Sequence, residues 1–189
     1  MSEQDRDHWD GRHAALGRAP VGETVLPAAF AAFEPMFPTA GLALELACGR
    51  GRLALWLASR GMQVHGVDVS PVAIDLARAL LSRSGLADRC RFDVLDLDGG
   101  LPAGPPADLI VCHLFRDARL DRAIGERLAP GGLLAIAVLS EVGAAPGPFR
   151  ARPGELRDAF RELELVAEGE SEGKAWLLAR RRSKESRYG

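Results

Sequence analysis

Residues 42–53 of the chain read LALELACGRGRL, and this stretch decides the fold. The apolar run Leu42–Leu46 predicts a short buried strand, and Gly49 and Gly51 predict a turn directly after it. The apolar spacing within Arg52–Arg60 then predicts a helix. A glycine turn between a strand and a helix lets backbone N–H groups approach a ligand without a Cβ in the way. The stretch therefore indicates both an α/β fold and the place of a binding site.

The same alternation of strand and helix continues along the chain. The predicted strands are Gln63–Val67, Cys90–Leu95, Asp108–His113 and Leu133–Leu139. Helices are predicted from Ser70-Pro71 onward, because serine caps a helix and proline suits its first turn, and over residues 117–128. Strands that alternate with helices predict a parallel sheet with helices on both faces.

The two ends of the chain have a different pattern. A polar stretch that contains Trp9 precedes a predicted helix, Glu23–Phe33. After residue 140 the sequence predicts, in order, a Gly/Pro-rich loop, a short helix and two strands; these are Glu141–Pro153, Pro153–Phe160, Leu163–Ala167 and Ala175–Ala179. The last two strands are joined across Glu168–Lys174, which is too short for a crossover helix, so we expect them to pair antiparallel.

Length, charge and cysteine content narrow the class of protein. The 189 residues, 47% of them hydrophobic, suit one domain, which we place at residues 1–182 with residues 1–40 as an N-terminal lid. The net charge is −2: residues 180–189 carry +4, which leaves −6 on the rest of the chain, and we expect the last residues of this basic stretch, 183–189, to form a tail. This balance argues against bulk capture of nucleic acid. Three cysteines without C-x-x-C spacing, a polar N-terminus and no long apolar run predict a cytoplasmic protein without a membrane span or a disulfide framework.

Two interpretations of the glycine turn are open on the residues alone. The stretch Gly49–Ala54 fits the dinucleotide pattern G-x-G-x-x-A, and Asp68 ends the next strand, where an acidic residue can hold ribose hydroxyls. Glu45 and Asp96, however, place further carboxylates at neighbouring strand ends, which suits a ligand that carries an amine, two hydroxyls and a sulfonium. The only tyrosine, Tyr188, lies in the tail, so the Tyr-x-x-x-Lys pair of short-chain reductases is missing.

The series LALELACGRG, GVDVS, VLDL, ADLIVCH and LAPGGLL resembles the motif series of class I S-adenosylmethionine-dependent methyltransferases. The resemblance covers about residues 40–140. It implies a Rossmann-like three-layer sandwich, a mostly parallel seven-stranded sheet of order 3-2-1-4-5-7-6 with an antiparallel C-terminal hairpin, and S-adenosyl-L-methionine as cofactor. The opening WDGRH at residues 9–13 and the phrase RGMQVHGVDVS resemble the small-molecule branch, which includes tellurite-resistance-like and thiopurine-type enzymes.

The resemblance also implies a set of cofactor-binding residues. The pattern E/D-x-G-x-G-x-G maps onto Glu45, Ala47, Gly49 and Gly51, with Ala47 in place of the first glycine and Cys48 as a small residue of the turn. The remaining assignments are Asp68 for the ribose diol, Val69 for the adenine face, Asp96 for the adenine amine with Leu97 beside it, and Arg12 near the methionine carboxylate. No metal site is expected.

Several residues outside the loop have two readings. His113 ends the fourth strand, where it is either a general base for the acceptor or a histidine that caps the strand. Trp9 and His13 either close a lid or pack on the core. Three arginines either line an anion-friendly acceptor pocket or are ordinary surface residues; they are Arg116, Arg150 and Arg152.

The reaction that fits these features is an SN2 methyl transfer to a small-molecule thiol, chalcogen or oxygen nucleophile, which requires alignment more than side-chain chemistry. The HLFRD segment differs from the N/D-P-P-Y/F motif of amino-group methylases, and no Pro-Cys pair indicates cytosine methylation. Three alternatives are open: a nucleic-acid or protein methyltransferase, a non-catalytic S-adenosylmethionine-binding protein, and a nicotinamide oxidoreductase. We expect a small-molecule partner, and neither nucleic acid nor membrane.

Overall fold

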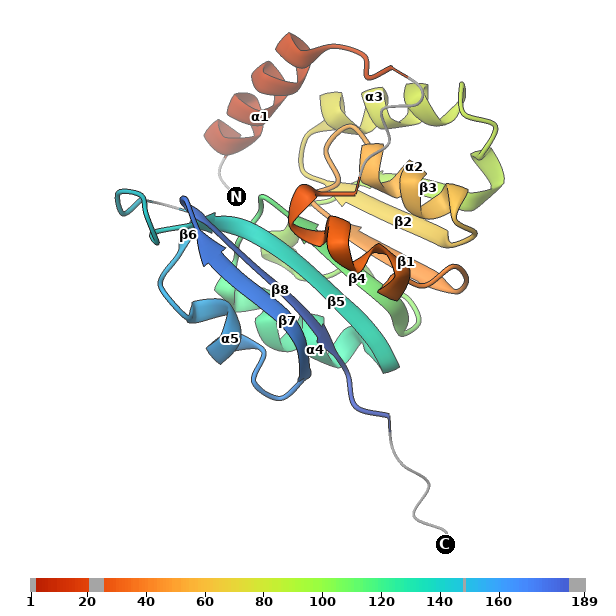
Figure 1. The fold of residues 1–189 in the computed structure, drawn as a ribbon. Helices are drawn as coiled ribbons and strands as arrows, with labels where there is room; N and C mark the ends of the chain where they lie inside the picture. The colour runs from red at the N-terminus through yellow and green to blue at the C-terminus, as the bar shows by residue number, and fades with distance from the viewer. Residues whose placement is uncertain (1–2, 21–25, 148, 184–189) are drawn as a thin grey trace, which may run out of the picture. The chain divides into compact units, whose positions relative to one another are not determined.

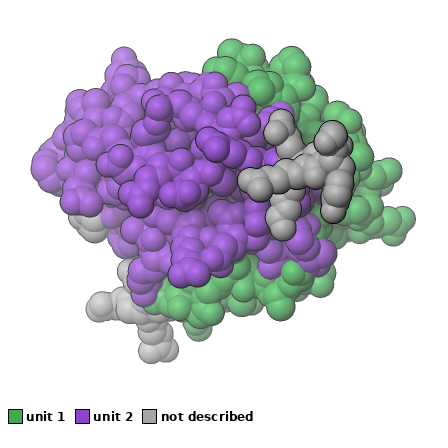
Figure 2. Space-filling model, turned by 90° about the horizontal axis from the view of Figure 1, so that it is seen from below, with its two compact units in different colours: residues 1–104 green, residues 105–189 purple. Residues whose placement is uncertain are grey.

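The computed structural model describes residues 3–20, 26–147 and 149–183. It contains two compact units, unit 1 at residues 1–104 and unit 2 at residues 105–189 (Figure 2). The assignment of residues 1–182 to one domain stays a prediction. Apart from Ser183, the predicted basic tail lies outside the described residues.

Unit 1 is built on three parallel strands in the order β3-β2-β1, with bounds Cys90–Val94, Gln63–Asp68 and Leu42–Leu46 respectively (Figure 1). The register pairs Glu45 with Gly66, and Gly66 in turn with Phe92. Helices α2 (Arg52–Ser59) and α3 (Pro71–Leu81) connect these strands. The carboxyl ends of β1 and β2 therefore lie side by side, which brings the segments that follow them together.

Helix α3 begins as the sequence predicts. The Ser70 hydroxyl accepts a hydrogen bond of 3.0 Å from the backbone N–H of Ala73, and Pro71 occupies the first turn. This cap satisfies one of the backbone donors that a helix start leaves unpaired. The apolar face of α3 is buried, and its buried residues are Ala73, Ile74, Ala77 and Leu80.

The N-terminal part of unit 1 differs from the prediction. Helix α1 (Glu3–Leu16) forms in the polar stretch, and its composition of Glu, Gln, Arg and Ala explains the helix although it has no apolar stripe. The predicted helix Glu23–Phe33 is wrong in its described part, where a 3₁₀ helix, η1 (Ala28–Met36), is found instead; residues 21–25 are outside the description. Proline explains this difference, because Pro27 and Pro35 have no amide donor and clash with a preceding carbonyl in an α-helix.

Unit 2 is a sheet of order β4-β5-β8-β7, in which β4 (Ala107–His113) and β5 (Leu128–Ser140) are parallel. Strand β8 (Lys174–Arg180) pairs antiparallel with both β5 and β7 (Glu164–Ser171). A two-residue strand, β6 (Arg150–Ala151), pairs parallel with the end of β5. The helices of this unit are the 3₁₀ helix η4 (Ala118–Leu120), α4 (Asp121–Arg127) and α5 (Glu155–Ala159). The strand orders within the two units confirm the predicted fold class, with β6 as an addition.

Two features of unit 2 correct the predicted boundaries. Strand β5 begins at Leu128 and runs through Pro130-Gly131-Gly132, which the sequence predicts as a turn. The backbone of Arg181 explains this, because it accepts a hydrogen bond from Gly131 N–H at 2.7 Å and donates one to the Gly132 carbonyl at 2.9 Å. The hairpin connection is also shorter than predicted. It consists of Glu172 and Gly173, both with positive φ, which is the backbone that matches the twist of a hairpin.

Candidate functional site

The loop between β1 and α2 has a left-handed backbone at three positions. The φ angles are 53° at Ala47, 52° at Gly49 and 73° at Gly51. The turn is closed by two backbone hydrogen bonds, from Cys48 N–H to the Val67 carbonyl at 2.9 Å and from Gly51 N–H to the Cys48 carbonyl at 3.0 Å. The loop is thus tied to the end of β2 before α2 begins.

Gly51 is required by packing as well as by backbone conformation. A Cβ at this position would lie 2.8 Å from Phe92 Cζ and 2.9 Å from the Ala77 Cβ. Such distances leave no room for a side chain between α3 and β3. Gly51 therefore permits close packing of α3 against β3, which in the dinucleotide fingerprint is the role of the third glycine and not of the second.

Asp68 fixes the loop to the start of α3. Its Oδ2 accepts a hydrogen bond of 2.8 Å from Gly49 N–H, and its Oδ1 accepts one of 2.9 Å from Ser70 N–H. The residue is only 6% exposed. Asp68 therefore caps the loop, as a structural carboxylate does. It also stands at the position where the sequence predicts a carboxylate that binds the ligand. Each oxygen retains a second lone pair for a further donor.

Glu45 lies beneath the loop and is 4% exposed. The pKa of its carboxyl is raised to about 8, mainly by burial; a hydrogen bond from the backbone of Ala54 acts against this rise, and the negative charge of Asp68 contributes to it. Its Oε2 atom is buried and finds no hydrogen-bond partner among the described residues. A buried acceptor of this kind is costly unless a donor is supplied from outside the chain.

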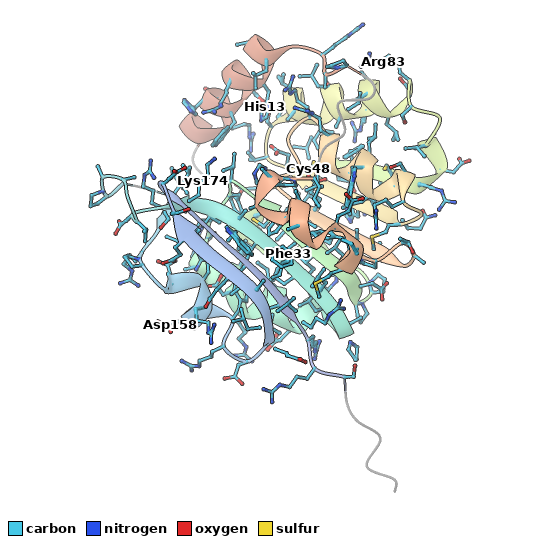
Figure 3. The ribbon with its side chains drawn as sticks, viewed as in Figure 1. His13, Phe33, Cys48, Arg83, Asp158 and Lys174 are labelled. Atoms are coloured by element: carbon cyan, nitrogen blue, oxygen red, sulfur yellow. The ribbon has the colours of Figure 1, made fainter. Side chains whose placement is uncertain are left out.

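Helix α1 is fastened to the same loop. The Arg50 guanidinium donates to the carbonyls of Leu16 at 3.1 Å and Gly17 at 3.0 Å, where α1 ends. The Ser70 hydroxyl also donates to the Asp10 carboxylate on α1. His13 of α1 lies close to the loop that carries Cys48 (Figure 3), and a Cβ at Gly49 would come 3.3 Å from its Cε1.

Two residues of α1, the half-buried His13 and the exposed Arg12, have different surroundings. Burial lowers the pKa of His13, the charges of Asp68 and Asp10 act to raise it, and its Nδ1 has no hydrogen-bond partner in the described parts of the chain. Arg12 is exposed and places its guanidinium 5.5 Å from the centre of the Trp9 ring. The structure therefore brings His13 to the loop and stacks Arg12 on Trp9.

The end of β3 carries the remaining predicted residues of unit 1. The Leu95 N–H donates to the Asp68 carbonyl at 2.8 Å, which places the segment after β3 beside Asp68. Asp96 caps the short 3₁₀ helix η3 (Leu97–Gly99) through a 2.9 Å hydrogen bond from Asp98 N–H. Asp93 instead forms an ion pair of 2.9 Å with Arg91, and its carboxylate lies 2.9 Å from Nε2 of His65. Val69 and Leu97 are both buried.

Cys48 is a structural residue of the turn. It is buried, and burial raises the pKa of its thiol well above the ordinary value, with the carboxylates of Glu45 and Asp68 adding to the effect. A thiol that stays protonated is a poor nucleophile. The structure thus agrees with the prediction that Cys48 fills a tight turn.

His113 belongs to unit 2, where it ends β4 at an exposed position. Protein atoms around the ring restrict its solvation and lower its pKa from the ordinary 6.5, and the positive charge of Lys174 lowers the pKa further. The imidazole is therefore neutral near pH 7 and able to accept a proton.

The three arginines have separate roles in unit 2. Arg116 is buried and forms ion pairs with Asp121 at 2.5 Å and Glu155 at 2.9 Å. It lines a cavity of about 590 Å³ together with Arg152. Arg150 instead donates to the Ser140 carbonyl at 2.7 Å. The pairing of Arg116 with two carboxylates could not be predicted from the sequence, because these partners lie 5 and 39 residues away.

The contacts that fasten α1 to the rest of unit 1 could not be predicted from the sequence either. Asp10 and Ser70 are 60 residues apart, and Arg50 is 34 residues from Leu16. The abundance of helix-forming residues in 3–16 is the signal that could have revealed α1. In the described parts of the chain, no group of three or more His, Cys, Asp or Glu side chains could hold a metal ion. No helix found there is both long and apolar enough to cross a bilayer.

Residues 43–132 match the model of a family described as the methyltransferase domain. This segment of the chain is thus similar to a methyltransferase domain. The match supports the predicted enzyme class, for which S-adenosyl-L-methionine is the expected cofactor. It covers the glycine loop, Asp68, Asp96 and His113, and leaves α1 and the C-terminal hairpin outside.

Methyltransferases of different substrates are similar to this chain. It is 37% identical over 138 residues to a ribosomal protein L11 methyltransferase of Thermus thermophilus, covering 71% of this chain and 49% of that protein. It is 31% identical to a ribosomal RNA small subunit methyltransferase C of Alcanivorax borkumensis, over 68% of this chain and 39% of that one. A 2-heptyl-1-hydroxyquinolin-4(1H)-one methyltransferase of Mycobacteroides abscessus is 30% identical over 67% of this chain and 60% of its own length. The chain thus spans about half the length of the ribosomal protein methyltransferase and less than half the length of the ribosomal RNA methyltransferase.

Among solved structures, TehB from Haemophilus influenzae superposes with a TM-score of 0.71 at 18% identity, over 94% of this chain and 67% of that one. At this level of identity the likeness shows the methyltransferase fold.

Proposed function

We propose that this chain transfers a methyl group from S-adenosyl-L-methionine to a small-molecule thiol, chalcogen or oxygen nucleophile. The observation that carries the proposal is the buried Glu45 carboxyl beneath a loop that Asp68 holds in a left-handed conformation. This arrangement presents acceptor atoms and a side-chain-free backbone at the carboxyl ends of parallel strands, where open α/β sheets bind their ligands.

The residues present fit the cofactor. The Glu45 Oε2 atom is a buried acceptor without a partner among the described residues, and an ammonium group is a donor that would satisfy it. Gly49 leaves open the space between the loop and His13 that a Cβ would enter. The residues that we propose to hold the cofactor are Glu45, Ala47, Cys48, Gly49 and Gly51 for the amino-acid part, Asp68 and Val69 for the ribose and the adenine face, Asp96 and Leu97 for the adenine amine, and Arg12 for the carboxylate.

When bound, S-adenosyl-L-methionine supplies a methyl group on a positively charged sulfur, which is a good leaving group. The acceptor sulfur or oxygen forms a bond to the methyl carbon as the bond from that carbon to the sulfonium breaks, and the acceptor proton leaves to a base. The chain's residues supply position and exclude water, which accounts for most of the acceleration in such a reaction. We propose His113 as the base, since its lowered pKa keeps the ring neutral near pH 7.

Methylation of a ribosomal protein or RNA is the second candidate, because two of the relatives are named for these substrates. The net charge of −2 favours the small-molecule acceptor over a nucleic acid. The quinolone methyltransferase relative is an example of a similar domain with a small aromatic acceptor.

Calorimetric titration with S-adenosylmethionine, S-adenosylhomocysteine and NADH tests the cofactor, and an acceptor panel then tests the substrate class. We expect both sulfur nucleosides to bind and NADH to give no heat. The panel contains small thiols, phenols and selenite on one side, and ribosomal RNA and ribosomal protein on the other. Transfer to the macromolecules alone would replace the first candidate by the second, and binding without any transfer would indicate a non-catalytic protein.

A further inference from the structure

Two large apolar residues of unit 2 are exposed on a left-handed backbone. Leu114 has a φ of 61° and is 48% exposed, and Phe149 has a φ of 63° and is 56% exposed. The left-handed region is unfavourable for residues with a Cβ, and bulky residues are found there rarely. Exposure of a large apolar side chain adds a further cost in water. Residues that combine both costs are candidates for a functional role.

The strand register brings the two residues to one place. Strand β4 pairs with β5 as far as His113 opposite Ala137, and the Leu114 N–H then donates to the Ala137 carbonyl at 2.7 Å. Strand β6 pairs with β5 from Arg150 opposite Leu139. At Leu139 the other edge of β5 is paired with β8, so β6 lies on the same edge of β5 as β4 does.

The gap between the end of β4 and the start of β6 is therefore short. Strand β4 ends opposite Ala137, and β6 begins opposite Leu139. These two residues of β5 are two positions apart, which corresponds to roughly 6.6 Å along the strand at the usual rise. Leu114 is the first residue beyond β4, and Phe149 is the last residue before β6. The two apolar side chains thus flank one gap in the sheet, next to His113 in the chain.

A purely structural explanation would favour other residue types. Four residues other than glycine have positive φ in the described structure, namely Ala47, Leu114, Phe149 and Glu172. Ala47 is small, and Glu172 lies in the β7–β8 turn, where a polar side chain is solvated. Glycine or asparagine would form the turns at positions 114 and 149 at lower cost. A chain that retains Leu and Phe there gains nothing in stability from them.

Charge at this gap is also limited. The Arg150 guanidinium, which lies next to Phe149, is directed to the carbonyls of Ser140 at 2.7 Å and Gly173 at 3.4 Å. These backbone contacts hold it as part of the framework of β5, β6 and the hairpin. The charge that does act at this level of β5 is that of Lys174, which pairs with Leu139 across the other edge of the strand and influences His113.

We propose that Leu114 and Phe149 form an apolar lip that receives the ring or alkyl group of an organic acceptor while His113 takes its proton. The inference rests on the proposed methyl transfer and names the acceptor class: an organic thiol or hydroxyl compound with an apolar group beside the nucleophilic atom, in preference to an inorganic oxyanion. Apolar pockets discriminate between ligands through such side-chain contacts by about tenfold or more.

Asparagine variants test the lip without disturbing the backbone, because asparagine accepts the left-handed conformation better than leucine or phenylalanine does. We expect the double variant Leu114→Asn, Phe149→Asn to keep its affinity for S-adenosylmethionine and to have the same or a higher melting temperature. Its KM for thiophenol should rise about tenfold or more, whereas its KM for 2-mercaptoethanol should change little. Glu172→Asn is the matched control, since it makes the same change to Asn at a left-handed position in the hairpin turn.

Equal KM values for thiophenol in the wild type and the double variant would overturn the proposal, as would a preference of the wild type for 2-mercaptoethanol or selenite. Failure of the proposed function has a different signature, namely no binding of S-adenosylmethionine or no transfer to any acceptor. In that case saturation-transfer NMR with thiophenol decides the matter. Binding to the wild type that is lost in the double variant supports the lip, and equal or absent binding removes it.

Discussion

The carboxylate of Asp68 accepts a hydrogen bond of 2.8 Å from the backbone N–H of Gly49, nineteen residues earlier in the chain. Its second oxygen accepts from Ser70 N–H at 2.9 Å, so one side chain holds both the glycine loop and the start of α3. The residue that is predicted to bind the ribose is therefore also the residue that holds the glycine loop in place.

Replacement of Asp68 by alanine should consequently affect both binding and stability. From the sequence alone we expect loss of cofactor binding with an intact fold. The structure adds that two buried N–H groups lose their acceptor, at a cost of about 1–3 kcal/mol in the free energy of unfolding. Calorimetry and urea unfolding measure the two effects. Asp93→Ala is the control, because this carboxylate lies on the surface of the neighbouring strand β3. If Asp68→Ala left the cofactor affinity unchanged, the placement of the site would be refuted.

Stability should fall as the pH rises, because of Glu45. Its pKa is about 8 in the folded protein against an ordinary value of 4.5, so the folded state binds more protons than the unfolded state between these values. The free energy of unfolding then decreases from pH 4.5 to pH 8, by on the order of a few kcal/mol, and levels off above pH 8. Urea unfolding of the unliganded protein at several pH values measures this slope.

Glu45→Gln is the matched variant for that experiment, since an amide of the same shape does not ionise. We expect its stability profile to be flatter than that of the wild type, and we expect the variant to be the more stable protein at pH 9. Parallel profiles of the two proteins would show that Glu45 does not cause the slope.

Ala47→Gly should stabilise the protein. Ala47 has a φ of 53°, a conformation that costs a residue with a Cβ about 1–2 kcal/mol, and glycine avoids this cost while it adds entropy to the unfolded chain. The net gain should be roughly 0.5–1 kcal/mol. Ala79→Gly in α3 is the control and should destabilise by about 1 kcal/mol, as glycine does in a helix. A loss of stability in Ala47→Gly would mean that the loop tolerates its alanine without strain.

The sequence predicts the elements whose signals are local. The loop after β1, the Ser70-Pro71 start of α3 and the antiparallel hairpin all follow from residues within one or two turns of each other, and the structure confirms them. The prediction fails where a distant partner decides the outcome. Strand β5 extends through glycines because Arg181, about fifty residues later, supplies its hydrogen bonds. Helix α1 shows no apolar periodicity because polar contacts to Arg50 and Ser70 fasten it.

Loosening of α1 should weaken cofactor binding if this helix covers the site. Arg50→Ala removes the donor to the carbonyls of Leu16 and Gly17, and we expect faster amide exchange in residues 3–17. The affinity for S-adenosylmethionine should fall about three- to tenfold, which corresponds to about 1 kcal/mol, the typical net contribution of a hydrogen bond. Arg89→Ala is the matched control, because Arg89 likewise donates to a backbone carbonyl, that of Gly61. If both variants exchange and bind alike, α1 does not act as a cover.

The role of His113 should be visible in the pH dependence of turnover. Burial and the charge of Lys174 lower the pKa of His113 below 6.5, so the ring becomes protonated only on the acid side of that value. A protonated ring cannot take up a proton from the substrate. The rate of a wild-type enzyme that uses this base should be level near pH 7 and fall toward low pH. His113→Gln should lower kcat by about 10²-fold, abolish this acid limb and leave the affinity for S-adenosylmethionine unchanged. A variant with full turnover and an unchanged acid limb would identify His113 as a residue that merely ends β4.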